Sequence, residues 1–91
     1  MKFRKKPVEI DAYEFTGGNA YYVNQWAREL GYTGPEFTEF EGTKLAIPTL
    51  EGTTIASPGD YVIRGVKGEY YACKPDIFAA TYDAVEEPVT T

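Results

Sequence analysis

The stretch PGDYVIRGVKGEYYACKPDIFAATY, residues 58–82, decides the fold of this chain. Residues 61–64 and 69–73 are rich in aromatic and β-branched side chains, and a Gly-Val-Lys-Gly segment lies between them. Two such runs around a short, glycine-containing connection predict a β-hairpin. Pro58-Gly59 predicts a tight corner before the hairpin, because proline presets the first turn position and glycine accepts the positive φ of the second.

Residues 75–81, which follow the hairpin, predict one short turn of helix. Pro75 suits a first helical position, and we expect Ile77 and Phe78 to anchor the turn. A final short strand is predicted to follow, through Ala84 or Val85. We interpret the corner and the helical turn as structural segments that flank the hairpin on either side.

Near the start of the chain, residues 8–13 predict a half-buried strand. Their polar and apolar side chains alternate with a period of two. The core face is predicted to hold Val8, Ile10 and Ala12. The solvent face is predicted to hold Glu9 and Asp11, with Tyr13 as a further candidate.

One amphipathic helix is predicted over residues 19–30. Asn19 is a favourable N-cap, and Gly31 is the expected stop. We interpret Trp26 as a core residue, with a ligand-stacking role as the alternative. The apolar stripe that should pack on a sheet consists of Tyr22, Val23, Trp26, Ala27 and Leu30. The opposite, solvent-facing side is predicted to hold Asn24, Gln25, Arg28 and Glu29.

Turns recur every six to ten residues between the helix and the hairpin. Short strands are predicted within residues 36–41, 43–50 and 53–57, with Pro48 ending its strand or confining it to a sheet edge. The expected fold class is α+β: a strongly bent antiparallel sheet of about five or six strands, forming a small, partly open barrel, with one packed amphipathic helix. Residues 1–91 are predicted to form a single domain, with a basic leader at 1–6 and a flexible tail at 86–91.

Composition narrows the classes of function. The net charge of −5 argues against binding to duplex DNA, which needs a basic surface. The sequence has no apolar run long enough to predict a membrane span, and its basic N-terminus lacks the apolar core of a signal peptide. The single cysteine, Cys73, cannot form an internal disulfide and is interpreted as a small buried hydrophobe rather than a reactive thiol. We therefore expect a cytoplasmic protein.

The chain also lacks the usual catalytic side chains. It has no histidine, and its one serine is Ser57, so acyl transfer by a catalytic triad and Cys/His metal sites are excluded. We expect no enzymatic activity, no cofactor and no metal. The weakest alternative is a hydrolase of phosphodiester or glycosidic bonds that uses the carboxylates of Asp60, Glu69 and Asp76.

The hairpin is the candidate site. Its basic side chains could neutralise phosphate, its tyrosines could stack on a base, and the two glycines of its loop could aim backbone N–H groups at an anion. In the alternative interpretation the hairpin is plain, and its basic side chains pair with Glu69 and Asp76. The predicted ligand-binding residues are Arg64, Lys67, Lys74, Tyr61, Tyr70, Tyr71, Gly65 and Gly68.

These motifs resemble a family of small proteins of tailed bacteriophages and prophages. Residues 58–82 are similar to that family's ending, which reads close to PGDWIIRGVKGEFYPCKPDIFEATY, and KKPVEIDAYEFTG at residues 5–17 is similar to its KPV-x-IEA-x-QWTG start. The resemblance implies a phage or prophage origin and expression in a bacterial cytoplasm. The resemblance implies little chemistry, and the chain departs from the family pattern on the aromatic face of the hairpin, where Tyr61 stands in place of a common tryptophan and Ala72 in place of a common proline.

Two functions follow as hypotheses. The first is a phage-encoded, non-enzymatic binding protein that sequesters a small anionic, nucleotide-derived ligand such as a host defence signal, with a homo-oligomer completing the pocket. The second is an interaction module that binds a host or phage protein, or that is itself a minor component of the virion.

Overall fold

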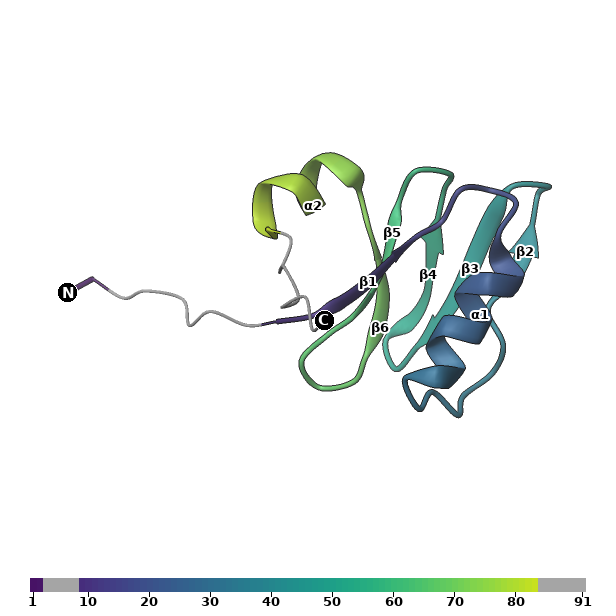
Figure 1. Cartoon of the computed structure of the whole chain (residues 1–91), viewed down its shortest axis with the longest axis horizontal. Helices are drawn as coiled ribbons and strands as arrows, with labels where there is room; N and C mark the ends of the chain where they lie inside the picture. The colour runs from purple at the N-terminus through teal and green to yellow at the C-terminus, as the bar shows by residue number, and fades with distance from the viewer. Residues whose placement is uncertain (3–8, 84–91) are drawn as a thin grey trace, which may run out of the picture.

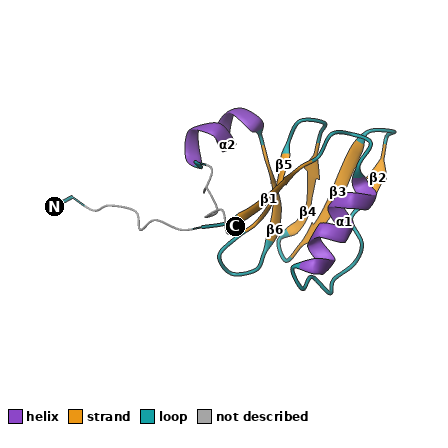
Figure 2. Cartoon of the chain, in the orientation of Figure 1, coloured by secondary structure: helices purple, strands orange, loops and turns teal. Residues whose placement is uncertain are grey.

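The structure, a computed structural model, describes residues 1–2 and 9–83 of the 91-residue chain. It contains two three-stranded antiparallel sheets and two helices (Figures 1 and 2). One sheet has the order β1-β5-β6, formed by β1 (Asp11–Glu14), β5 (Tyr61–Arg64) and β6 (Tyr70–Cys73). The other has the order β2-β3-β4, formed by β2 (Thr38–Phe40), β3 (Lys44–Thr49) and β4 (Gly52–Ala56). The helices are α1 (Ala20–Glu29) and α2 (Pro75–Thr81).

The α+β class and the six short strands are confirmed, but the barrel is not. Strand β6 contacts β3 and β4, yet no hydrogen-bonded ladder joins the two sheets in the described part of the chain. The corner at Ser57–Asp60 turns the chain so that the consecutive strands β4 and β5 belong to different sheets. The described strands therefore form two packed sheets and no closed barrel.

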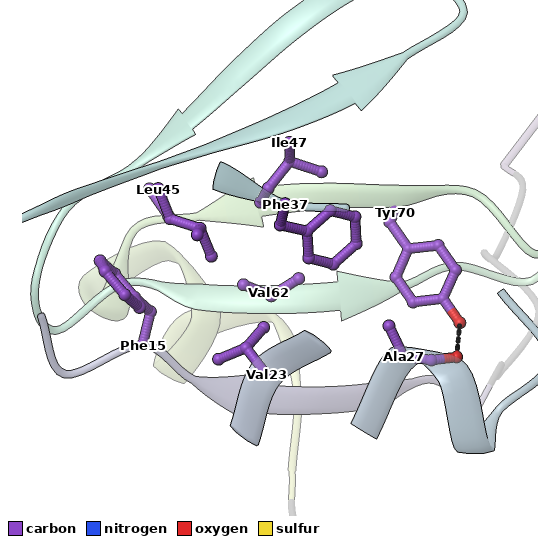
Figure 3. Close-up of a cluster of buried hydrophobic side chains, with 9 residues drawn as sticks. Phe15, Val23, Ala27, Phe37, Leu45, Ile47, Val62 and Tyr70 are labelled. Atoms are coloured by element: carbon purple, nitrogen blue, oxygen red, sulfur yellow. Dashed lines mark hydrogen bonds between the residues drawn. The ribbon is translucent and has the colours of Figure 1, made fainter. Parts of the chain in front are cut away.

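The core lies between α1 and the two sheets (Figure 3). Side chains from both sheets and from the helix meet there, so the core ties the two sheets together in place of a shared ladder. The hydroxyl of Tyr70 donates a hydrogen bond to the carbonyl oxygen of Ala27 across this core, at 3.4 Å. The buried cluster consists of Phe15, Val23, Ala27, Phe37, Leu45, Ile47, Ala56, Val62 and Tyr70.

Helix α1 begins and ends where the sequence predicts, but Asn19 does not cap its N-terminus as predicted. Gly31 follows the helix with a φ of 97°, as expected of its stop residue. Asn19 makes no side-chain hydrogen bond to the helix N-terminus. Its Oδ1 accepts from the N–H of Thr16 at 2.8 Å, and its Nδ2 donates to the carbonyl oxygen of Glu14 at 2.9 Å. Asn19 therefore ties the loop before the helix to the end of β1.

Two residues of α1 lie on the opposite side from the one predicted. Tyr22 is 60% exposed, so its assignment to the core stripe is wrong. Asn24, expected on the solvent face, is instead partly buried. It accepts a hydrogen bond from the N–H of Phe37 and donates one to the same residue's carbonyl oxygen, both at 2.9 Å. The segment leading into β2 runs over this side of the helix, and no local pattern around Asn24 indicates that.

In strand β1 the assignment of faces is also wrong. Tyr13 pairs with Val62 in the ladder and packs against the core, with its ring centroid 5.7 Å from that of Trp26. Ala12, expected in this core, pairs with Ile63 and lies on the other face of the sheet. That face is apolar as well, which is why alternation alone did not identify the core side. Val8 and the predicted strand at Ala84 or Val85 lie outside the described residues.

Helix α2 follows β6 and lies beside one end of the β1-β5-β6 sheet (Figure 1). It begins at Pro75, as predicted. The ring of Phe78 stacks on that of Tyr61 with centroids 4.0 Å apart and an interplanar angle of 10°. Aromatic stacking therefore attaches this seven-residue helix, none of whose side chains is fully buried.

Candidate functional site

The β5–β6 hairpin forms as predicted, and its register separates the residues of the candidate site. Arg64 lies opposite Tyr70, whereas Tyr61 lies opposite Cys73. Tyr70 and Ala72 share the face of β6 that packs on the main core. The three predicted cations consequently lie in three different places.

Lys74 lies at the end of the hairpin away from the turn. Its Nζ is 3.0 Å from Oδ2 of Asp60, a carboxylate that is almost fully buried at the corner before β5. The same Oδ2 accepts a hydrogen bond from the N–H of Ser57 at 2.9 Å. Lys74 therefore neutralises a structural carboxylate, and the expectation that it joins Arg64 in a phosphate site is wrong.

Lys67 lies in the exposed turn, and the turn already holds an anionic group of its own. The N–H of Lys67 donates to Oε2 of Glu69 at 3.0 Å. The N–H of Gly65 donates to the carbonyl oxygen of Glu69 at 2.7 Å, and the N–H of Gly68 to that of Gly65 at 3.0 Å. The backbone amides that the sequence suggested for binding an anion therefore donate their hydrogen bonds within the turn, one of them to the carboxylate of Glu69.

Tyr61 and Tyr71 lie on the outer face of the sheet, beside α2. The ring of Tyr61 is already stacked on Phe78. Burial raises the pKa of Tyr71 well above its usual value, with a hydrogen bond to Tyr82 as a second cause. Cys73 on the same face is half-buried rather than buried, and desolvation together with Asp60 and Asp76 raises its thiol pKa, which favours the unreactive protonated form.

Three of the predicted residues do meet, in a groove on the other side of the hairpin. The groove is a hollow of about 360 Å³ between the loop that follows α1 and the β5–β6 turn. Glycines contribute much of its wall, so backbone is accessible there. Its lining consists of Leu30, Gly31, Tyr32, Thr33, Gly34, Arg64, Gly68 and Tyr70. We call this hollow the Arg64 groove.

Arg64 supplies positive charge to the groove. One of its guanidinium nitrogens, Nη1, lies 3.6 Å from Oδ2 of Asp11 on the neighbouring strand, and both side chains are partly exposed. Burial raises the pKa of Tyr70, while the nearby Arg64 charge opposes that shift, as expected for a guanidinium close to a phenol oxygen. Tyr70 itself is only 6% exposed, so the prediction that its ring stacks on a base is wrong; it forms the floor of the groove.

Tyr32 is the groove residue that sequence reasoning missed. Its ring lies 5.0 Å from that of Tyr70, and the guanidinium of Arg28 lies over it, 5.0 Å from the ring centroid. Its hydroxyl donates to the carbonyl oxygen of Pro35 at 2.6 Å. A Cβ on Gly34 would overlap the Tyr32 ring, so glycine is required for this approach. A tyrosine between two glycines, GYTG, is the signal in the sequence that could have drawn attention to this loop.

A second hollow, of about 330 Å³, lies on the exposed side of α1. Beside it the rings of Tyr21 and Tyr22 meet edge to face with centroids 5.3 Å apart, and both are more than half exposed. The lining combines amide, carboxylate and guanidinium groups: Tyr21, Asn24, Gln25, Arg28, Glu29 and Glu36.

Within residues 1–2 and 9–83, no group of three or more His, Cys, Asp or Glu side chains is arranged to hold a metal ion. Neither of the described helices has the length and apolar character needed to cross a membrane. Comparison with family models, curated proteins and solved structures found no match to this chain.

Proposed function

We propose that this protein is a non-enzymatic binding protein that holds a small anionic, nucleotide-like ligand in the Arg64 groove. The observation that carries the proposal is the meeting of Arg64 with Tyr32 and Tyr70 in one concave surface, although the three residues come from separate segments. A guanidinium beside aromatic walls suits a ligand with both an anionic group and a planar base. The groove offers both features in one place.

Each wall of the groove has a role in this proposal. Arg64 binds the anionic group, because a guanidinium presents several donors in a planar fork. Tyr32, whose own ring lies under the guanidinium of Arg28, supplies an aromatic wall beside the base, and Tyr70 forms the floor of the groove. Gly31, Gly34 and Gly68 leave the backbone open to the ligand, since they carry no side chain.

Binding by sequestration is the mode that fits these features. The groove contains no nucleophile paired with a base, and its lining carries a single charged side chain, Arg64. Its volume lies near the lower end of the range of about 300–1,000 Å³ for small-molecule pockets. A second copy of the chain would enclose a ligand more completely, so we propose a homo-oligomer as the binding form.

The proposed setting is the cytoplasm of a phage-infected or prophage-bearing bacterium. The resemblance of residues 58–82 and 5–17 to phage proteins supports this setting. A small phage protein that removes a nucleotide-derived signal would interfere with a host defence pathway by mass action alone.

The test is a calorimetric titration of the folded protein with nucleoside monophosphates, cyclic nucleotides and ADP-ribose. The proposal predicts saturable heat with at least one of them, and its loss in Arg64→Gln. No heat with any of the three classes would overturn the proposal.

The exposed tyrosine pair favours a second function, an interaction module for a host or phage protein. Tyr and Arg are among the residues most enriched in interface hot spots. Tyr21 and Tyr22 lie within two helical turns of Arg28 on α1. A pull-down from bacterial lysate tests this function: it predicts one stoichiometric partner that is lost in a Tyr21→Ala, Tyr22→Ala double variant. Retention of the partner by that variant would exclude this surface.

A further inference from the structure

We infer that the Arg64 groove takes a phosphate monoester, and that the ligand binds by replacing Asp11 as the anionic partner of Arg64. This inference rests on the proposed function and narrows it to a ligand class and a residue that sets the affinity. Asp11 then acts as an internal competitor. It holds the guanidinium in place when no ligand is present and lowers the affinity of the groove for every anion.

The position of Asp11 follows from the sheet register. Asp11 lies opposite Arg64 in the β1–β5 ladder, and Arg64 lies opposite Tyr70 in the β5–β6 ladder. Residues opposite one another in a ladder place their side chains on the same face. The carboxylate, the guanidinium and the phenol therefore form one row across the sheet, at the edge of the groove.

The ion pair of Asp11 and Arg64, whose charged atoms lie 3.6 Å apart, is exposed to water, and this exposure favours an exchange of partner. Within the described residues, Asp11 is the one carboxylate paired with Arg64, and the two side chains are 51% and 37% exposed. Pairs that water reaches in this way are worth little, at most about 1 kcal/mol, which corresponds to about fivefold in affinity. A ligand anion can therefore displace Asp11 at a modest and measurable cost.

The chemistry of the competitor indicates the class of ligand. A ligand carboxylate offers Arg64 the same group as Asp11 without the advantage of being tethered beside it. A phosphate monoester carries a charge near −2 at neutral pH and three acceptor oxygens, so it binds a guanidinium more strongly than a carboxylate or a singly charged phosphodiester does. The groove should consequently prefer monoesters.

Calorimetry on the full chain at pH 7.5 tests the inference with four probes: AMP, 3′,5′-cyclic AMP, adenosine and inorganic phosphate. We expect AMP to bind at least about fivefold more tightly than cyclic AMP, because its charge is doubled. Adenosine should give no heat, and inorganic phosphate should bind more weakly than AMP. Tighter binding of inorganic phosphate than of AMP would contradict the inference, because the groove would then take free phosphate in preference to its monoester.

The variant Asp11→Asn and its control Glu14→Gln test the role of Asp11. Both remove one negative charge from β1, but Glu14 lies opposite Tyr61, away from Arg64. Asp11→Asn should tighten AMP by up to about fivefold, whereas Glu14→Gln should leave the affinity within about twofold of the wild-type value.

The outcomes separate the inference from the function on which it rests. If AMP and cyclic AMP bind equally, or if the two variants behave alike, the inference is overturned and the binding function stands. If the folded wild-type protein binds no nucleotide at all, both are overturned.

Discussion

The Nζ of Lys74 lies 3.0 Å from Oδ2 of Asp60, at a corner where the carboxylate is almost completely buried. The same oxygen accepts the N–H of Ser57, and the N–H of Asp60 donates to the carbonyl oxygen of Ser57 at 2.9 Å. The side chain of Asp60 therefore stabilises the corner between the two sheets. A lysine that the sequence suggested for phosphate binding belongs to this corner.

Asp60→Ala should lower the free energy of unfolding by about 1–3 kcal/mol, because it leaves a part-buried N–H without its acceptor. Asp60→Asn should cost less, since an amide oxygen can still accept from Ser57. Urea denaturation measures both. Wild-type stability in Asp60→Ala would contradict a structural role for the carboxylate.

Asn24→Ala tests the connection between α1 and the second sheet. The side chain of Asn24 satisfies both the N–H and the carbonyl oxygen of Phe37, so we expect a loss of about 1–3 kcal/mol. Gln25→Ala is the matched control on the same helix, because its amide bonds only the exposed hydroxyl of Tyr21. Equal midpoints for the two variants in urea would show that the Asn24 bonds do not support the fold.

Gly34→Ala tests the position of Tyr32 in the Arg64 groove. The new Cβ would overlap the Tyr32 ring, so the ring must shift from its present position beside Tyr70. We expect a changed near-ultraviolet circular dichroism spectrum and at least about tenfold weaker AMP binding, the equivalent of about 1.4 kcal/mol. An unchanged spectrum together with unchanged affinity would remove Tyr32 from the site.

Alkaline pH should destabilise the protein through its buried tyrosines. Burial raises the pKa of Tyr70 and of Tyr71, so the folded state holds their protons more tightly than the unfolded state, in which tyrosine has a pKa of about 10. The stabilisation is complete below about pH 10 and is lost as pH rises toward the folded pKa values, by about 1.4 kcal/mol per pH unit for each tyrosine. Tyr71→Phe removes one of the titrating groups, so it should reduce this slope by about 1.4 kcal/mol per pH unit. A free energy of unfolding that stays constant above pH 10 would contradict the burial of these phenols.

The hairpin, α1 and α2 could be predicted from the sequence because each depends on local signals. Gly65 and Gly68 mark the turn, Gly31 ends α1, and Pro75 begins α2. These residue types favour the observed backbone conformations whatever surrounds them.

The Arg64 groove could not be predicted in this way, since it joins the loop after α1 to a strand more than thirty residues later in the sequence. The inward direction of Tyr70 and Tyr13 also depends on which sheet face α1 covers, and both faces of the β1-β5-β6 sheet are apolar. The division into two sheets depends on the corner at Asp60, whose buried carboxylate has no distinguishing sequence pattern.

We propose that Arg64, and not the cluster of three cations suggested by the sequence, binds the anion. Titration of AMP into the wild-type protein, Arg64→Gln and Lys74→Gln tests this most directly, because each variant removes one positive charge and the structure places the two residues at opposite ends of the hairpin. We expect that binding is lost in Arg64→Gln and stays within about twofold of the wild-type affinity in Lys74→Gln, the range expected from a distant, screened charge. Equal losses in the two variants, or binding that survives in Arg64→Gln, would contradict the proposal.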